Sequence, residues 1–176
     1  MQRKPIDINK LQVLPHDLFR NRSVLLASGD YAAGDYNAMT IGWGALGTMW
    51  SEPFVFVAVR HSRYTFQFME KYDSFTLSAY PSEYQPALTL LGSESGRDGD
   101  KIAKSGLTPA ASAVVAAPSF AEAEIVIECR KVYENDLNPA HFLTEEIYRH
   151  YPTRDFHRIY YGWIEHVAGV EKYGVE

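Results

Sequence analysis

Two short basic segments carry the residues best suited to bind a ligand in this sequence. The first, residues 60–65 (RHSRYT), joins a predicted strand to a predicted helix and supplies two guanidinium groups and three hydroxyls: Arg60, Arg63, Ser62, Tyr64 and Thr65. Unpaired N–H groups at a helix start favour an anion, and a well-oriented arginine can hold a phosphate through two hydrogen bonds. The segment predicts a site for a phosphate monoester, with a solvated helix start capped by Ser62 as the alternative.

The second basic segment, residues 93–104 (SESGRDGDKIAK), is a glycine-rich loop that leads into a short predicted helix. Its hydroxyl, backbone and cationic donors are Ser93, Ser95, Gly96, Arg97, Lys101 and Lys104. Taken alone, such a loop is more typical of a flexible, solvated turn. The chain has a formal net charge of -5, so a phosphate must be held by local cations and not by the overall field. Two basic segments in one acidic chain therefore favour phosphate binding.

A third segment, residues 36–43 (YNAMTIGW), predicts a wall for a planar ligand. Asn37 and Thr40 can hydrogen-bond the polar edge of a ring, whereas Ala38 and Gly42 leave room for a flat group. Trp43 packs either on that ligand or in the core, which is the commoner place for a single tryptophan.

Gly42, Gly44 and Gly47 match the G-x-G-x-x-G pattern of dinucleotide-binding folds, but the residues after them do not. That pattern requires a helix whose N-terminus faces the pyrophosphate. Residues 48–52 (TMWSE) have poor helix propensity, and Pro53 would break a helix that began at Gly47. We therefore expect the glycines to allow a close approach of the chain or a barrel corner.

Strands must position these segments, because strand patterns dominate the sequence. Runs rich in β-branched and aromatic residues predict strands at residues 23–28, 36–41, 54–60, 74–80, 123–133 and 158–167. Alternation in residues 123–133 predicts one buried face and one solvated face: Ile125, Ile127 and Cys129 against Glu124, Glu128 and Arg130.

Helices are predicted to be short and to lie between the strands. Their ranges are residues 63–72 capped by Ser62, 86–91 ended by Gly92, 100–106 capped by Asp100 and ended by Gly106, and 143–151. The balance of elements predicts a mainly β fold, a β-barrel with peripheral helices.

Composition indicates a single globular domain over residues 1–176. The net charge of -5 argues against nucleic acid or an anionic membrane as the main partner. No apolar stretch reaches the roughly 20 residues of a membrane span, and residues 1–10 lack the apolar run of a signal peptide. The single cysteine, Cys129, excludes an internal disulfide, so we expect a cytoplasmic protein. We expect no metal site, because these histidines lack metal-binding spacing: His141, His150, His157 and His166.

The order of these motifs resembles the flavin reductase-like, FMN-binding split-barrel family, and within it the flavoredoxin-like branch. The resemblance covers about Val24 to Tyr133. The motifs that show the resemblance are NAMTIGW (37–43), the turn at residues 51–53 (SEP), VRHSRYT (59–65) and SGRDGDK (95–101). A weaker similarity is present in HRIYYGWIEHV (157–167).

The resemblance implies a Greek-key split barrel and a homodimer, with FMN bound near the subunit interface. It places these residues along the isoalloxazine ring: Asn37, Ala38, Met39, Thr40, Ile41, Gly42 and Trp43. It places these residues around the ribityl phosphate: Arg60, Ser62, Arg63, Tyr64, Thr65, Ser95, Gly96, Arg97 and Lys101.

The implied activity is that of an oxidoreductase, in which reducing equivalents from NAD(P)H or a protein donor pass through FMN to an acceptor. An NAD(P)H-dependent flavin reductase is the favoured form. A flavoredoxin-type electron carrier and a non-enzymatic FMN-binding or sensing barrel are the alternatives. No catalytic side chain is expected, because the flavin carries the chemistry and hydride transfer needs no acid or base from the protein.

Overall fold

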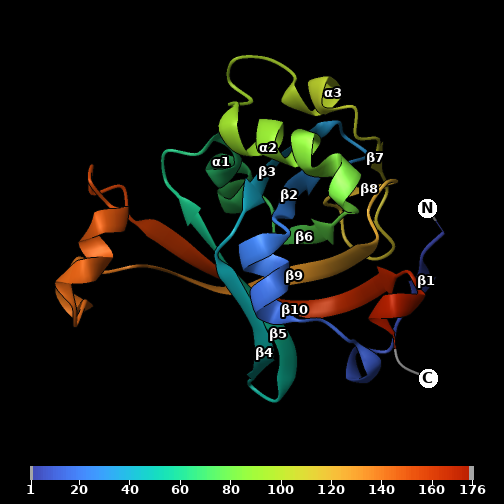
Figure 1. Cartoon of the computed structure of the whole chain (residues 1–176), viewed down its shortest axis with the longest axis horizontal. Helices are drawn as coiled ribbons and strands as arrows, with labels where there is room; N and C mark the ends of the chain where they lie inside the picture. The colour runs from blue at the N-terminus through green and yellow to red at the C-terminus, as the bar shows by residue number, and fades with distance from the viewer. Residues whose placement is uncertain (1, 175–176) are drawn as a thin grey trace.

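The computed structural model describes residues 2–174 and shows a large antiparallel sheet with helices at its periphery (Figure 1). The sheet is 8-stranded; its main path runs β3-β2-β6-β9-β10-β5-β4, and β1 pairs with β10. These strands are β1 (Lys4–Pro5), β2 (Val24–Asp30), β3 (Asp35–Ile41), β4 (Gly44–Met49), β5 (Glu52–Arg60), β6 (Ser74–Ala79), β9 (Ile125–Asp136) and β10 (His157–Gly169). A separate pair consists of β7 (Pro109–Ala110) and β8 (Ser119–Phe120). The mainly β fold is confirmed, while a single domain over residues 1–176 stays a prediction.

The helices are short and most of them connect strands. The α-helices are α1 (Tyr64–Lys71), α2 (Gln85–Ser93) and α3 (Lys101–Ser105). The remaining turns of helix are a π-helix at Asp17–Asn21 and 3-10 helices at Ile8–Lys10, Ser82–Tyr84, Pro139–His141, Glu145–His150 and Glu171–Tyr173. Among the described residues, no helix is long and apolar enough to cross a membrane.

Two predicted helix ends differ from the structure. The N-cap of α1 is Arg63 and not Ser62, because the Ser62 hydroxyl donates to Asp155 Oδ2 instead. Helix α2 continues through Gly92, which was predicted to end it. A Cβ at Gly92 would lie 3.2 Å from Thr40 Cβ, so this glycine allows the helix to approach β3 closely. The predicted limits of α3 are confirmed: Asp100 caps it and Gly106, at φ 73°, ends it.

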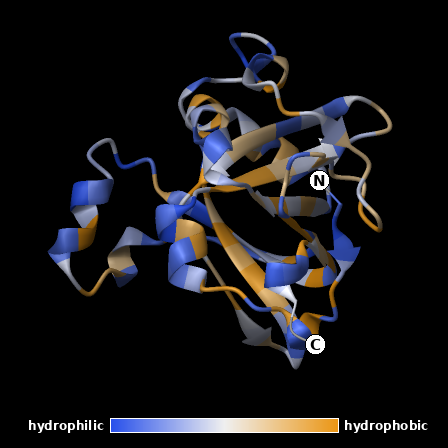
Figure 2. Ribbon diagram, turned by 45° about the vertical axis from the view of Figure 1, so that its right-hand side comes forward, coloured by the Kyte–Doolittle hydropathy of each residue, from blue (hydrophilic) through white to orange (hydrophobic). Residues whose placement is uncertain are grey.

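The strands bury apolar side chains on both faces, and hydrophobic residues follow the strands through the body in Figure 2. Leu26 and Leu77 belong to a cluster on one side of the sheet. Leu25 and Val126 belong to a second cluster, which Leu88 of α2 covers. Neighbouring residues enter different clusters because strand side chains alternate between faces.

The predicted solvated face of β9 is wrong at its N-terminal end. The predicted buried face is confirmed, since Ile125, Ile127 and Cys129 are all buried. On the other face, Glu128 is only 3% exposed. Its carboxylate accepts the N–H groups of Ala113 and Val114 at 2.9 and 2.8 Å. A distant loop therefore covers this face, and its backbone satisfies the buried charge.

Strand β4 is absent from the sequence-based prediction, although it pairs with β5 along its length. It contains the second and third glycines of the G-x-G-x-x-G pattern, so no helix follows them, as expected. A Cβ at Gly44 would lie 2.5 Å from Phe19 Cε1 and 2.7 Å from the Phe56 carbonyl oxygen. The expectation that a glycine permits a close approach is confirmed at this position.

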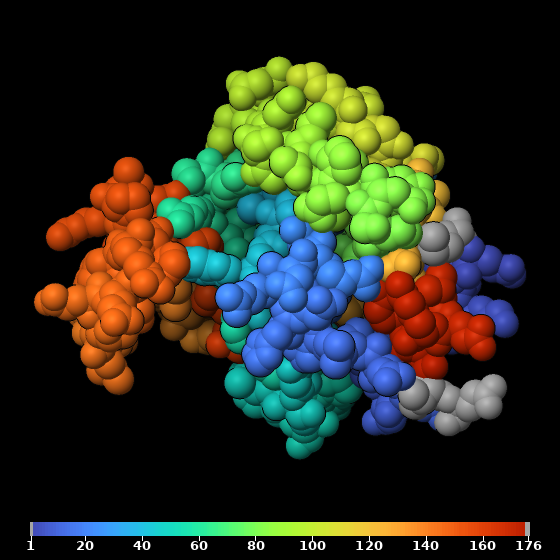
Figure 3. Space-filling view, in the orientation of Figure 1, coloured from blue at the N-terminus to red at the C-terminus, as the bar shows by residue number. Residues whose placement is uncertain are grey.

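Residues 137–156, here called the arm, leave the sheet between β9 and β10 and project from the body (Figures 1 and 3). A 3-10 helix at Glu145–His150 replaces the helix predicted over residues 143–151. The C-terminal end of the arm is tied to β5, because Arg60 Nη2 donates to the His150 carbonyl at 2.7 Å. The tip is open to solvent, and Leu143 is 100% exposed.

Candidate functional site

A cavity of about 220 Å³ lies where β3, β5 and β10 meet. Its lining consists of Met39, Thr40, Ile41, Gly42, Trp43, Ala58, Arg60, Arg63 and His157. The Ala58 N–H donates to the Trp43 carbonyl at 3.2 Å, which joins the end of β3 to β5. The structure therefore places residues 39–43 along one cavity, while binding of a planar ligand there stays a prediction.

Trp43 forms the rim of this cavity and does not enter the core. The ring is 42% exposed and lies 4.6 Å, centroid to centroid, from the imidazole of His157. Its edge contacts His150 and Tyr151 of the arm. The arm therefore supports the tryptophan from one side and leaves its remaining surface available for a ligand.

His157 is a site residue that sequence reasoning missed. Burial, and then the nearby charge of Arg60, lower its pKa to about 4, so the imidazole is neutral near pH 7. Its Nδ1 lies 2.8 Å from the hydroxyl of Tyr151. The sequence analysis judged this histidine only by its spacing from other histidines, which bears on metal binding. Such spacing cannot indicate that the residue lines a cavity formed by three strands far apart in the sequence.

A smaller cavity of about 80 Å³ lies between the start of α1 and the loop after α2. Its lining comes from both basic segments: Arg63, Tyr64, Thr65, Ser93, Glu94, Ser95 and Lys101. Arg97 Nη1 donates to the Ser62 carbonyl at 3.0 Å, which holds the two segments together. Arg63 lines both this cavity and the one beside Trp43, so the two are neighbours.

The donors at the start of α1 suit an anion. The N-cap residue Arg63 forms no side-chain cap, and although the Phe66 N–H donates to the Arg63 carbonyl at 3.0 Å, the N–H groups of Tyr64 and Thr65 have no acceptor within the helix. The Thr65 oxygen accepts a hydrogen bond from Asn37 Nδ2 at 2.7 Å. The hydroxyl proton of Thr65 therefore remains available to a ligand.

Two cations beside this cavity lack an acidic partner. Among the described residues, neither Arg63 nor Lys101 forms a salt bridge. Arg63 Nη2 donates to the Gly92 carbonyl at 2.6 Å, and Lys101 Nζ to the Leu91 carbonyl at 2.9 Å. Burial and the charge of Arg63 lower the pKa of Lys101 to about 8, and burial followed by Arg60 lowers the pKa of Arg63. A bound anion would relieve the cost of both charges.

Several predicted site residues have other contacts in the structure. Asn37 and Ala38 are buried and lie outside the lining of the 220 Å³ cavity. Thr40 donates its hydroxyl proton to the Leu88 carbonyl at 2.6 Å, so towards a ligand its oxygen can only accept. Arg60 binds the arm through His150 and its guanidinium lies 5.2 Å from the ring centroid of Tyr151. The side chains of Ser62 and Arg97 are used in contacts within the protein, with Asp155 and with the Ser62 carbonyl respectively. Gly96 allows the loop to approach α1 closely, since a Cβ there would lie 2.6 Å from the Tyr64 ring.

Comparisons with known proteins agree on one protein family. The model of a family described as "Flavin reductase like domain" matches residues 18–172. An uncharacterized protein of Archaeoglobus fulgidus is 31% identical over 117 residues, which are 66% of this chain and 64% of that protein. The matched region thus spans less than two thirds of that relative.

Solved structures share the fold at low sequence identity. An FMN-binding domain of a flavin reductases-like enzyme from Shewanella baltica is 15% identical with a TM-score of 0.69, covering 96% of this chain and 77% of that one. Flavoredoxin of Desulfovibrio vulgaris is 23% identical with a TM-score of 0.65, over 85% and 70% of the chains. A putative flavin reductase with a split-barrel domain from Shewanella frigidimarina is 15% identical with a TM-score of 0.65, over 85% and 67%. The predicted split-barrel fold is confirmed.

Proposed function

The chain belongs to the flavin reductase-like domain family, and from this premise we propose that it is an FMN-binding oxidoreductase. The proposal rests on one observation above the others. In an acidic chain of net charge -5, the half-buried Arg63 and the buried Lys101 line one cavity, and neither forms a salt bridge among residues 2–174. Such an arrangement is stabilised by a phosphate, which FMN carries and riboflavin lacks.

The residues present match the two chemically different parts of FMN. Cations, hydroxyls and the uncapped N–H groups of α1 surround the small cavity, and this donor set suits the phosphate. The adjoining cavity offers the 39–43 backbone, the ring of Trp43 and the neutral imidazole of His157, which suit a flat ring with polar edges. FMN, when bound, accepts a hydride or electrons and passes them on.

The protein's own contribution is to hold and shield the flavin. Arg63 and Lys101 would bind the phosphate, assisted by the hydroxyls of Thr65 and Ser95. Residues 39–43 would line the ring, and Trp43 together with the arm would limit access of water from one side. Neutral His157 can accept or donate a hydrogen bond without adding charge near the ring.

The electron donor we favour is NAD(P)H, which makes the protein a flavin reductase. Similar structures include nitrilotriacetate monooxygenase component B from Bacillus cereus and 2-nitrobenzoate 2-nitroreductase from Pseudomonas fluorescens. The flavoredoxin neighbours support the second candidate, a carrier that takes electrons from a protein. A non-enzymatic FMN-binding barrel is the third. The proposed setting is the cytoplasm, in keeping with the single, buried and unpaired thiol of Cys129.

A homodimer is part of the proposal, supported by exposed aromatic side chains on β9 and on the turn between β4 and β5. Trp50 is 55% exposed and Tyr133 46% exposed, with their ring centroids 6.3 Å apart. Beside them, the half-buried Tyr161 stacks on the buried Phe54 with ring centroids 5.8 Å apart. Large exposed aromatic clusters mark interaction surfaces. We expect Trp50→Glu to turn a dimer into a monomer in analytical ultracentrifugation, whereas a monomeric parent protein would contradict this part of the proposal.

Binding of FMN is tested with a double variant and a matched control. Arg63→Ala with Lys101→Ala removes the two unpaired cations, while Lys104→Ala with Arg130→Ala removes two exposed cations that have acidic partners. We expect the first pair to weaken FMN binding about tenfold or more and the second to leave it nearly unchanged. Riboflavin affinity reports whether the fold survives. Equal FMN affinity in both double variants would contradict the assignment.

The electron donor is tested by steady-state oxidation of NADH and NADPH in the presence of free FMN. Rapid turnover supports the reductase. Binding of FMN without turnover of either nucleotide would exclude it and leave the carrier or the non-enzymatic barrel.

A further inference from the structure

The turn at residues 60–63 connects the phosphate cavity to the arm. It is a four-residue turn, because the Arg63 N–H donates to the Arg60 carbonyl at 3.1 Å. Its last residue, Arg63, is the N-cap of α1 and lines both cavities proposed to hold FMN. The side chains of its first three residues all contact the arm. The place of Arg63 therefore depends on how the arm holds this turn.

Two contacts attach the turn to the arm in addition to the hydrogen bond from Arg60. His61 Nδ1 lies 3.1 Å from the carbonyl oxygen of Phe156. The hydroxyl of Ser62 donates to Oδ2 of Asp155. Only the Ser62–Asp155 contact joins two side chains, since the other two end on backbone carbonyls. A single substitution can therefore remove this contact and leave the backbone of the arm intact.

A strained turn of the arm presents Asp155 to Ser62. The preceding residue, Arg154, has φ 59°, a left-handed conformation that is uncommon for residues other than glycine. The Phe156 N–H donates to the Arg154 carbonyl at 3.0 Å, which closes the chain around Asp155. Strained residues of this kind persist where surrounding contacts fix them, and they cluster at functional sites. Ser62 is the only hydrogen-bond donor to the Asp155 carboxylate among residues 2–174.

The charge of Asp155 does not explain its place beside the phosphate segment. Asp155 forms no salt bridge in the described part of the chain. By its charge alone, a carboxylate near the cavity weakens binding of a phosphate. Its contact fixes Ser62, whose carbonyl also accepts Arg97 Nη1 and which directly precedes Arg63. Charge and position therefore predict opposite effects on FMN affinity when the Asp155 carboxylate is removed.

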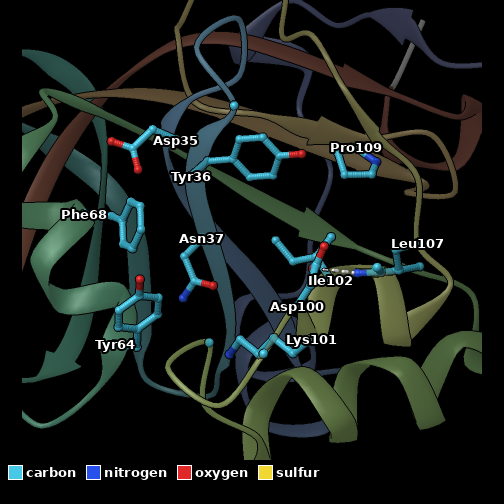
Figure 4. Close-up of a pocket in the computed structure, with 14 residues that line it drawn as sticks. Asp35, Tyr36, Asn37, Tyr64, Phe68, Asp100, Lys101, Ile102, Leu107 and Pro109 are labelled. Carbon is cyan, nitrogen blue, oxygen red and sulfur yellow. Dashed lines mark hydrogen bonds between the residues drawn. The ribbon is translucent and has the colours of Figure 1, made fainter.

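Contacts with β3 fix the start of α1 from the side opposite to the arm. Figure 4 shows Tyr64, the first residue of α1, beside Asn37 of β3 and across the cavity from Lys101 of α3. Asn37 Nδ2 donates to the Thr65 oxygen at 2.7 Å. The first residues of α1 are thus held by the sheet, whereas the 60–63 turn before them is held by the arm.

We propose that Asp155 is a positioning residue for the FMN phosphate. It fixes the 60–63 turn through the Ser62 hydroxyl and thereby places the N-cap of α1. The inference rests on the proposed function. The arm also contacts the edge of Trp43 at the ring cavity, so it touches both parts of the FMN site. By linkage, firmer attachment of the arm means firmer retention of FMN, and bound FMN holds the arm in return.

Fluorescence titration with FMN and riboflavin tests two variants of Asp155. Asp155→Ala removes the acceptor and the charge, whereas Asp155→Asn keeps an acceptor oxygen for Ser62 and removes only the charge. We expect Asp155→Ala to weaken FMN binding about threefold or more and riboflavin binding much less, because riboflavin has no phosphate. Asp155→Asn should retain the FMN affinity of the parent protein. Glu145→Ala, which removes an exposed carboxylate from the same arm, should leave both affinities unchanged.

A double-mutant cycle isolates the contact between the two side chains. Ser62→Ala should weaken FMN binding as much as Asp155→Ala does. The double variant should lose no more affinity than either single variant, because both changes remove the same interaction. If Ser62 binds the phosphate directly, the two losses add, and that result refutes the positioning role of Asp155.

Hydrogen exchange in the FMN-free protein tests the inference without a ligand. Asp155→Ala should speed exchange of the Arg63 and Phe66 N–H groups, which donate to the carbonyls of Arg60 and Arg63. The inference is overturned by unchanged exchange, by FMN affinity of Asp155→Ala equal to or above that of the parent, or by an equal loss of FMN and riboflavin affinity. These three results leave the proposed function standing. A parent protein that does not prefer FMN to riboflavin refutes the proposed function and this inference with it.

Discussion

The pKa of Lys101 gives FMN binding a specific pH dependence. In the free protein, burial and the charge of Arg63 lower this pKa to about 8. A phosphate dianion next to the ammonium would stabilise its charged form and raise the pKa again. Above pH 8, binding must therefore be accompanied by uptake of a proton, and affinity must fall as the pH rises.

The size of the change in FMN affinity follows from the protonation of Lys101 in the free protein. With a pKa of about 8, roughly nine tenths of the Lys101 side chains are protonated at pH 7 and roughly one tenth at pH 9. The dissociation constant for FMN should thus rise about tenfold between these pH values, which corresponds to about 1.4 kcal/mol. The phosphate does not contribute to this change, because its second pKa is about 6.

Fluorescence titration of FMN at pH 7 and pH 9 measures this ratio directly. Lys101→Met keeps the length and burial of the side chain but removes the charge, so its ratio should be close to one and its affinity at pH 7 should be lower. Riboflavin should show no tenfold change with the parent protein. A tenfold ratio that persists in Lys101→Met, or no change in the parent protein, would refute the assigned role of Lys101.

Three further predictions concern other parts of the site and the sheet. Arg63→Lys keeps the positive charge but loses the planar pair of guanidinium donors. FMN affinity, measured by fluorescence titration, should therefore fall severalfold below that of the parent protein even though the charge is kept. Gly44→Ala should lower the free energy of unfolding, measured by urea denaturation, by about 1–3 kcal/mol because its Cβ would collide with Phe19. Gly42→Ala should lower it clearly less, because the atom nearest to its Cβ would be the Phe19 carbonyl oxygen at 3.4 Å. The His157 imidazole should stay neutral between pH 5 and 8, since its pKa is lowered to about 4; an NMR titration midpoint above 6 would contradict its burial beside Arg60.

Local patterns in the sequence were enough to predict much of the fold. Alternation and β-branched residues identify the runs that become β2, β3, β5, β6, β9 and β10. Strand β4 was not predicted because four of its six residues are glycine, alanine or threonine, without alternation of polar and apolar side chains. It is a strand because β5 supplies its hydrogen-bond partners, which no local pattern records.

The sequence by itself determined the chemistry of the proposed phosphate site. Five cations and several hydroxyls in two short segments of an acidic chain are local facts, and they already favour an anion. The tertiary structure decided which of these side chains line the proposed site. It gives Arg63 and Lys101 no salt bridge within residues 2–174, ties Arg60 to the arm, and brings His157 to Trp43 across more than a hundred residues of chain. Burial and pairing depend on contacts between distant segments, whereas residue type and spacing do not.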